Sequence, residues 1–266
     1  MSQNKIQKSK ILKIDENDSH QINDYLAVEA PLEIRLGHKS NEFKSFAITM
    51  CSPDDIGDLI YGYLFTENII GEKSDILEIN IFDNDLGLIA EVILGKSIAY
   101  EKYLNKRHGM VHASCGVCGK TEFDDLLTFN YPKLQLSANS ISIEIIQSLP
   151  SMLNQHQQAF TKTGGLHASA LFNANGDLII AKEDIGRHNA LDKLIGTALQ
   201  QGLLPLTDYI VLLSGRVSFE LVHKSLMAGV SSLAAIGAPS SLSVEIAKLN
   251  HLQLFGFVRN GGFNEY

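Results

Sequence analysis

The C-terminal half of the chain contains the stretch LIIAKEDIGRHNALDKLIGTALQ at residues 178–200, which predicts the fold class. Its first four residues are apolar and predict a buried strand, the polar turn that follows contains Gly186, and the remainder reads as a helix. The same order of strand, glycine turn and helix recurs over residues 209–229. Strands that alternate with helices indicate an α/β domain in which helices cover a mostly parallel sheet.

We therefore expect an α/β domain over residues 126–266. Its expected strands cover residues 166–172, 178–181, 209–213, 233–236 and 252–258. Its expected helices cover residues 141–149, 152–160, 185–200, 219–229 and 243–249.

The N-terminal half has a different pattern and predicts a smaller α+β domain over residues 21–104. Alternating apolar residues indicate two strand pairs, within residues 32–50 and 76–94. Residues 1–20 are polar and show no periodicity, so they predict a loose tail.

A helix is expected between the two strand pairs. Ser52 and Pro53 are typical of a helix start, which predicts a helix to about Phe65 with Ser52 as its cap. Cys51 precedes this cap, and we interpret it as a half-buried structural thiol.

Composition restricts the class of protein. The chain has 266 residues, of which 45% are hydrophobic, so it can bury a sizeable core. Its net charge of -8 makes a nucleic-acid backbone an improbable partner, and no apolar run approaches the ~20 residues of a membrane helix. The N-terminus lacks the apolar core of a secretory signal, and an odd count of three cysteines argues against a disulfide framework. We expect a cytoplasmic enzyme that binds neither nucleic acid nor membranes.

Two of the three cysteines, Cys115 and Cys118, lie in a glycine-flanked Cys-x-x-Cys pair within residues 105–125, which we expect to be a mobile loop. Such a pair can be half of a zinc site, a redox couple or a nucleophilic thiolate. A zinc site would recruit His108 and His112. The polar residues before the pair do not suit a thioredoxin-like redox motif. A reactive thiolate is favoured by the cationic neighbours, which are Arg107, His108, His112 and Lys120.

Three glycine-containing turns lie at strand ends in the expected α/β domain. They span residues 163–167, 183–189 and 214–220. Strand ends in such sheets bind ligands, and helix N-termini favour anions, so the turns together predict a site for a phosphate-bearing ligand. Ordinary polar networks, such as ion pairs of Arg187 or Arg216 with nearby carboxylates, are the alternative. No P-loop or dinucleotide fingerprint is present.

The order and spacing of four motifs resemble those of the FdhD/NarQ family, the formate dehydrogenase accessory sulfurtransferases, over roughly residues 25–260. The motifs are SCGVCG at residues 114–119, TGGLHA at 163–168, EDIGRHNALDK at 183–193 and SGRVSFE at 214–220. The resemblance implies a cytidine-deaminase-like three-layer α/β domain and a homodimer. It also implies transfer of sulfur from a cysteine desulfurase to the molybdenum bis(molybdopterin guanine dinucleotide) cofactor, on behalf of the formate dehydrogenase catalytic subunit.

The resemblance further assigns roles to residues. Cys115 would carry the persulfide, Cys118 would assist, and no resident metal is expected. GDP, a fragment of the cofactor, is the expected analogue. The residues expected to contact the cofactor are Gly164, Gly165, His167, Arg187, His188, Asn189, Gly215, Arg216, Ser218, Phe257, Val258, Arg259, Asn260, Gly261 and Gly262.

Two other functions remain open at this point: a zinc-binding interaction module and a cofactor chaperone without chemistry. Deamination is rejected. A zinc deaminase needs an H-x-E segment followed by P-C-x-x-C, whereas here the cysteine pair precedes the α/β domain and no proline precedes the pair.

Overall fold

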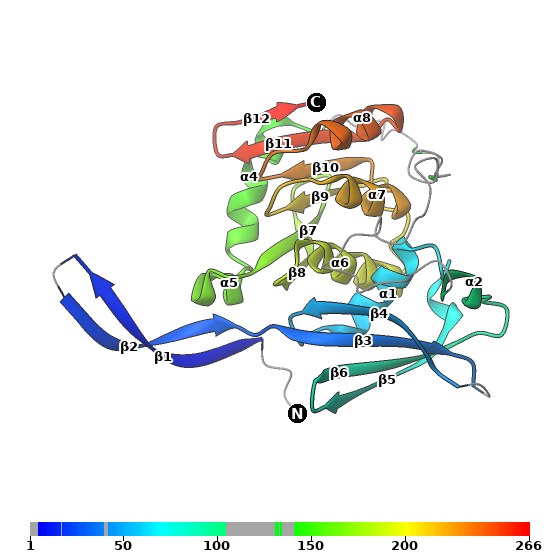
Figure 1. The fold of residues 1–266 in the computed structure, drawn as a ribbon. Coiled ribbons are helices and arrows are strands. Elements are labelled where there is room, and N and C mark those ends of the chain that lie inside the picture. The colour runs from blue at the N-terminus through cyan, green and yellow to red at the C-terminus, as the bar shows by residue number, and fades with distance from the viewer. Residues whose placement is uncertain (1–4, 17, 40–41, 105–130, 133, 135–140) are drawn as a thin grey trace.

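The structure is a computed structural model, and it describes residues 5–16, 18–39, 42–104, 131–132, 134 and 141–266. The described chain forms a two-stranded ribbon, a four-stranded sheet and a six-stranded sheet (Figure 1).

The N-terminal residues form a ribbon instead of the expected loose tail. Strand β1 (Ile6–Asp15) pairs antiparallel with β2 (Asp18–Ala27), from Ile6 opposite Ala27 to Asp15 opposite Asp18. Most side chains on both strands are exposed, so the apolar periodicity that signals a half-buried strand is weak here. The ribbon projects away from the two sheets, and we call it the arm (Figure 1).

The four-stranded sheet confirms the two strand pairs expected in the N-terminal half. Its elements are β3 (Ala30–Gly37), β4 (Lys44–Cys51), α1 (Ile56–Thr66), the short 3₁₀ helix η1 (Lys73–Asp75), β5 (Ile76–Asn84), β6 (Gly87–Leu94) and α2 (Glu101–Leu104). The strand order is β4-β3-β6-β5, with β3 and β6 parallel. Helix α1 packs on one face through Leu59, Ile60 and Leu64, which are buried in the same core as β3 and β6.

The predicted cap of α1 is wrong. The helix begins at Ile56, and its N-cap is Asp55, which has φ 51° and makes no side-chain capping hydrogen bond. Ser52 instead accepts a hydrogen bond at Oγ from the backbone N–H of Ile185, at 3.1 Å. A residue in the other half of the chain thus replaces the local partner that the sequence suggested.

The six-stranded sheet is built by the C-terminal half. Its elements are α4 (Ile143–Asn154), α5 (Gln158–Thr163), β7 (His167–Asn173), β8 (Leu178–Asp184), α6 (Arg187–Gln201), β9 (Tyr209–Leu213), α7 (Phe219–Met227), β10 (Ser232–Ala235), α8 (Ser241–Leu249), β11 (Gln253–Arg259) and β12 (Gly262–Glu265). The alternating strands and helices confirm the predicted α/β class. Strand β12 was not predicted, and α4 is one helix with Pro150 inside it.

This sheet is mixed, so the expectation of a mostly parallel sheet is wrong. The strand order is β12-β11-β10-β9-β7-β8, and of the neighbouring strand pairs only β9-β10 and β10-β11 are parallel. Alternate residues of β9 point to opposite faces: Val211 packs with α6, α7 and α8, whereas Leu212 packs with α4. Helices therefore cover both faces, which confirms three layers.

The two larger sheets are joined by close packing of α1 on α6. A Cβ added at Gly62 would lie 1.8 Å from the Asp192 carbonyl oxygen, and one at Gly196 would lie 1.9 Å from that of Asp58. Only glycine permits this approach of the two helix backbones. The contact fixes α6, whose N-terminus carries Arg187 and His188.

Candidate functional site

A pocket lies at the carboxyl ends of the parallel strands β9, β10 and β11. It has a volume of about 880 Å³. Ser214, Ile236 and Val258 line it from the ends of the three strands, and α4 and α5 supply the opposite wall. This is the edge at which α/β sheets bind ligands, since polar loops converge there.

Six of the expected cofactor contacts line this pocket. They are Gly164, Gly165, His167, Val258, Arg259 and Asn260. They come from two segments nearly a hundred residues apart in sequence, and the antiparallel placement of β7 beside β9 brings the segments together. Ser214 holds this junction, because its Oγ accepts a hydrogen bond from the Ala168 N–H at 2.8 Å.

A second, more open hollow of about 610 Å³ adjoins the pocket. It is lined by Phe257, Gly261 and Gly262 among others, and it shares Arg259 and Asn260 with the pocket. Phe257 has φ 53°, an unusual conformation for an aromatic residue, and Gly261 has φ 108°. The turn between β11 and β12 thus presents the whole expected segment 257–262 at one place.

A cationic corner lies beside His167, but the three expected contacts that form it, Gly215, Arg187 and Arg216, line neither hollow. A Cβ at Gly215 would lie 3.2 Å from Nδ1 of His167 and 4.0 Å from Cδ of Arg187, so glycine leaves room for both side chains. Nε of Arg187 is buried without a hydrogen-bond partner, and among the described residues no carboxylate lies within ion-pair distance of Arg187. A buried guanidinium N–H without an acceptor is costly, which favours an anionic ligand at this corner.

His167 is electrostatically coupled to the same corner. Burial lowers the pKa of His167, and the positive charge of Arg187 lowers it further. Asp184 opposes this shift, and Arg216 makes a smaller lowering contribution. His167 is therefore neutral at pH 7 and can both donate and accept a hydrogen bond.

Three other expected contacts lie in polar networks outside the lining of both hollows. Nε2 of the buried His188 lies 3.2 Å from Ser218 Oγ and 3.8 Å from Glu220 Oε2, and burial lowers the pKa of His188. The Asn189 amide donates to the carbonyl oxygen of Met50 at 2.8 Å and to Asp184 Oδ1 at 3.2 Å. For these residues the geometry agrees with a structural role.

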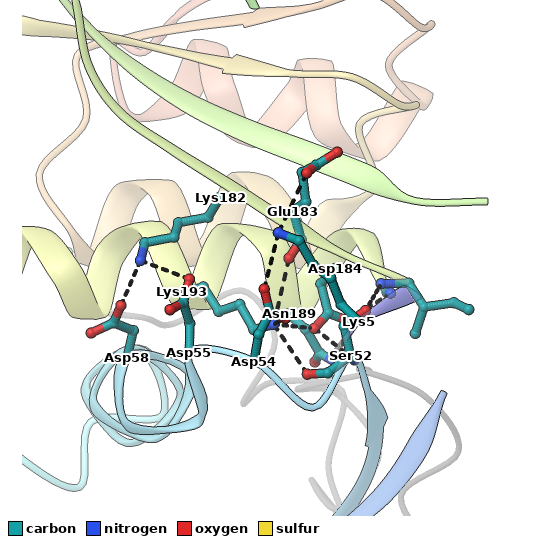
Figure 2. A network of polar contacts seen from close by, with 12 residues as sticks. Lys5, Ser52, Asp54, Asp55, Asp58, Lys182, Glu183, Asp184, Asn189 and Lys193 are labelled. Carbon is teal, nitrogen blue, oxygen red and sulfur yellow. Dashed lines mark hydrogen bonds and ion pairs between the residues drawn. The ribbon is translucent and has the colours of Figure 1, made fainter. Parts of the chain in front are cut away.

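Lys193, a buried cation that was not singled out from the sequence, helps to fix the turn that leads into Arg187. Lys193 is fully buried, and its Nζ lies 2.7 Å from Asp184 Oδ2 and 3.0 Å from Asp54 Oδ1 (Figure 2). Burial alone would lower the pKa of Lys193, but the two carboxylates raise it. Asp184 Oδ1 also accepts from the Gly186 N–H at 2.8 Å, which fixes the turn that leads into Arg187.

Cys51 lies beside this network and is fully buried, not half-buried as expected. Burial raises its pKa to about 12, and the negative charge of Asp184 adds to the shift. At neutral pH the Cys51 thiol is therefore protonated and shielded, which agrees with the predicted structural role.

The candidate sulfur-chemistry residues lie outside the described part of the chain. They are Cys115 and Cys118, together with Arg107, His108, His112 and Lys120. Within the described residues no cluster of three or more His, Cys, Asp or Glu side chains could hold a metal ion. No helix there is long and apolar enough to cross a membrane.

The chain closely resembles known proteins over most of its length. The FdhD/NarQ family model matches residues 27–266. The chain is 38% identical to the sulfur carrier protein FdhD of Nocardia farcinica, over 91% of this chain and 86% of that protein. It is 37% identical to the sulfur carrier protein FdhD of Saccharolobus solfataricus, over 98% of this chain and 96% of that protein.

A crystal structure has the same fold. It is that of a protein from Desulfotalea psychrophila described as a formate dehydrogenase accessory protein, with a TM-score of 0.72 and 21% identity over 98% of this chain and 96% of that one. The family match and the relatives agree, and we conclude that this chain belongs to the FdhD/NarQ family.

Proposed function

We propose that this protein is a sulfurtransferase that receives sulfur from a cysteine desulfurase and passes it to the molybdenum bis(molybdopterin guanine dinucleotide) cofactor required by formate dehydrogenase. The observation that carries the proposal is the match to relatives named sulfur carriers over nearly the whole chain. The proposal includes a homodimer in the cytoplasm, with the formate dehydrogenase catalytic subunit as client.

In the first step the Cys115 thiolate attacks the terminal sulfur of the desulfurase persulfide. A new S–S bond forms on Cys115, the bond to the desulfurase sulfur breaks, and the desulfurase leaves as a thiolate. In the second step Cys118 attacks the inner sulfur of the Cys115 persulfide. This releases the terminal sulfur at the sulfide level and leaves a Cys115–Cys118 disulfide, so the electrons balance without another reductant.

The described pocket supports binding of the cofactor as a substrate. The cationic corner at Arg187 suits a phosphate group, because its buried Nε lacks an acceptor. The segment 257–262 borders both hollows and would close over the remainder of the ligand. In this assignment His167 and Gly215 shape the phosphate site, and the positive charge of Arg216 attracts the phosphate from a longer distance.

Mass spectrometry of the intact protein tests the sulfur step directly. After incubation with a desulfurase and cysteine, the protein should gain about 32 Da, removable by a thiol reductant. The same treatment of Cys115→Ser should give no such adduct. An adduct that persists in Cys115→Ser would contradict the assigned carrier.

A cofactor chaperone without chemistry is the second candidate. Replacement of both Cys115 and Cys118 separates the two functions. A chaperone would still activate formate dehydrogenase, whereas a sulfurtransferase would not.

A further inference from the structure

The pocket wall that α5 forms is held by a side chain from another element. Gln157 occupies the N-cap position of α5 but makes no capping hydrogen bond through its side chain. The buried Glu183 on β8 takes over that role, because its Oε1 accepts from the Phe160 N–H at 2.8 Å and its Oε2 accepts from the Ala159 N–H at 3.2 Å. Hydrogen bonds to a carboxylate are the stronger kind, so Glu183 fixes the start of this short helix to the sheet.

The segment that Glu183 fixes forms one side of the pocket. Phe160, Gly164 and Gly165 all line the pocket. Gly164 has φ 64°, and its N–H donates to the Phe160 carbonyl oxygen at 2.7 Å, so the glycine turn continues directly from the helix. A shift at the start of α5 therefore moves the pocket wall.

The base of the arm supplies a positive charge to Glu183. We define the arm base as Lys5, Ala27 and Val28, where the ribbon closes and the Val28 N–H donates to the Lys5 carbonyl oxygen at 3.0 Å. Nζ of Lys5 lies 3.4 Å from Glu183 Oε2 and 3.0 Å from Asp54 Oδ2 (Figure 2). The Glu183 side chain is only 7% exposed, whereas that of Lys5 is 29% exposed. A carboxylate so far removed from water is costly without an opposite charge beside it, and Lys5 provides one.

The arm base also touches the pocket wall directly. A Cβ added at Gly165 would lie 3.4 Å from the Cβ of Ala27, the last residue of β2. Strand β2 packs on α5 as well. The arm base therefore contacts the α5 wall at both ends, at its start through Glu183 and at its glycine turn through Ala27.

We propose that Lys5 and Glu183 are positioning residues, which fix the α5 wall against the arm base and thereby set the affinity of the pocket for a phosphate-bearing ligand. Neither side chain lines the pocket, so both act through Phe160 and the glycine turn. Without the Lys5–Glu183 pair the wall is less ordered in the free protein, and binding has to supply the free energy of ordering it. Such coupling is reciprocal, so a bound ligand in turn stabilises the arm base. This role rests on the proposed use of the pocket as the cofactor site.

Calorimetry of the full chain with GDP as the probe tests the positioning. Lys5→Met should weaken GDP binding roughly two- to fivefold, the range expected for loss of a partly exposed ion pair. Lys5→Arg should restore most of the affinity, because it keeps the positive charge. The control variant Lys8→Met removes the same charge from an exposed position of β1 and should leave the affinity unchanged. Equal GDP affinities of Lys5→Met and Lys8→Met would overturn the proposal.

A double-mutant cycle determines whether Lys5 acts through Glu183. Glu183→Gln should weaken GDP binding about tenfold, because the new amide places a donor opposite one of the helix N–H groups. Lys5→Met in the Glu183→Gln background should then cause little further loss, since the pair is already broken. A full further loss would mean that Lys5 attracts the nucleotide directly or acts through Asp54, and it would overturn the proposal.

Hydrogen exchange reports on the same contact by a second route. In the free protein the Ala159 and Phe160 N–H groups should exchange faster in Lys5→Met than in Lys8→Met, and GDP should slow exchange of the Val28 N–H in the wild type. Circular dichroism verifies that each variant is folded, and the exchange rates decide the outcome if Glu183→Gln does not fold. Unchanged exchange rates, or a wild type that does not bind GDP, would overturn the proposal.

The sulfur adduct of about 32 Da is measured separately on the wild type. Its absence, together with the expected GDP affinities, would reject sulfur transfer and leave the positioning role intact. Its presence, together with equal GDP affinities of Lys5→Met and Lys8→Met, would reject the positioning role alone.

Discussion

Nζ of Lys193 and Oδ2 of Asp184 form a 2.7 Å ion pair in which both side chains are completely excluded from solvent. The pair connects the first turns of α6 to the end of β8, and Asp184 also accepts a hydrogen bond from the Ser52 N–H at 3.0 Å. The hydrogen bond from Ser52 thus joins this buried pair of the C-terminal half to the N-terminal half of the chain (Figure 2).

Lys193→Met should destabilise the fold strongly, because it leaves the Asp184 carboxylate buried without its cation. Removal of one partner from a buried pair costs about 3–5 kcal/mol. Chemical denaturation measures the loss. Lys182→Met is the matched control: Lys182 pairs with Asp55 and Asp58 nearer the surface, and its loss should cost about 1 kcal/mol or less. Equal losses of unfolding free energy in the two variants would mean that burial does not determine how much the Lys193–Asp184 pair contributes to stability.

Cys115→Ser should abolish activation of formate dehydrogenase, because a hydroxyl cannot hold sulfane sulfur. Cys118→Ser should reduce activation less, since an external thiol can release the sulfur from Cys115. The measurement is dehydrogenase activity after maturation with each variant, with the amount of folded protein matched. Full activation by Cys115→Ser would exclude the proposed mechanism.

Cys51→Ala should leave activation intact and lower the free energy of unfolding by about 1 kcal/mol, because it removes one small buried group. In the folded wild type, Cys51 should react with iodoacetamide only after unfolding, since burial raises its pKa to about 12. Rapid labelling in the native state would show that Cys51 is accessible.

Arg187→Met should weaken GDP binding by about tenfold or more, because a hydrogen bond to a charged group contributes roughly 1.5–3 kcal/mol. Wild-type GDP affinity should fall as salt rises, and ADP should not bind detectably. Calorimetry gives both results, and persulfide formation on Cys115 should be unaffected by the change. Equal binding of GDP and ADP, or binding of neither, would remove the pocket assignment.

GDP affinity should increase as pH falls below about 6.5, the ordinary pKa of histidine. In the free protein, burial and the two arginines hold the pKa of His167 below this value, so the side chain is neutral. A bound phosphate would raise the pKa of His167, so binding would take up a proton, strengthen as pH falls from the pKa of the complex toward that of the free protein, and level off below the free-protein pKa. The phosphate of GDP titrates in a similar range, so His167→Gln serves as the reference. A pH profile that is identical in the two proteins would show that His167 does not face the phosphate.

The local pattern of the sequence determined the fold class and the position of most elements in the described domains. The spacing of apolar residues and the position of a glycine turn depend only on neighbouring residues. Strands such as Tyr209–Leu213 and helices such as Arg187–Gln201 could therefore be predicted from their own residues. The order of the motifs likewise identified the family, because that order is carried by the chain itself.

Contacts between distant segments could not be predicted in this way. Ser52 has the sequence of a helix cap, yet its hydroxyl serves Ile185 on the other half of the chain. His188 and Asn189 lie in the same motif as Arg187, yet of the three only Arg187 has a buried side-chain nitrogen without a hydrogen-bond partner. The sequence placed all three residues at one turn, and the tertiary structure decided their roles, because burial and hydrogen-bond partners depend on which other segments pack against that turn.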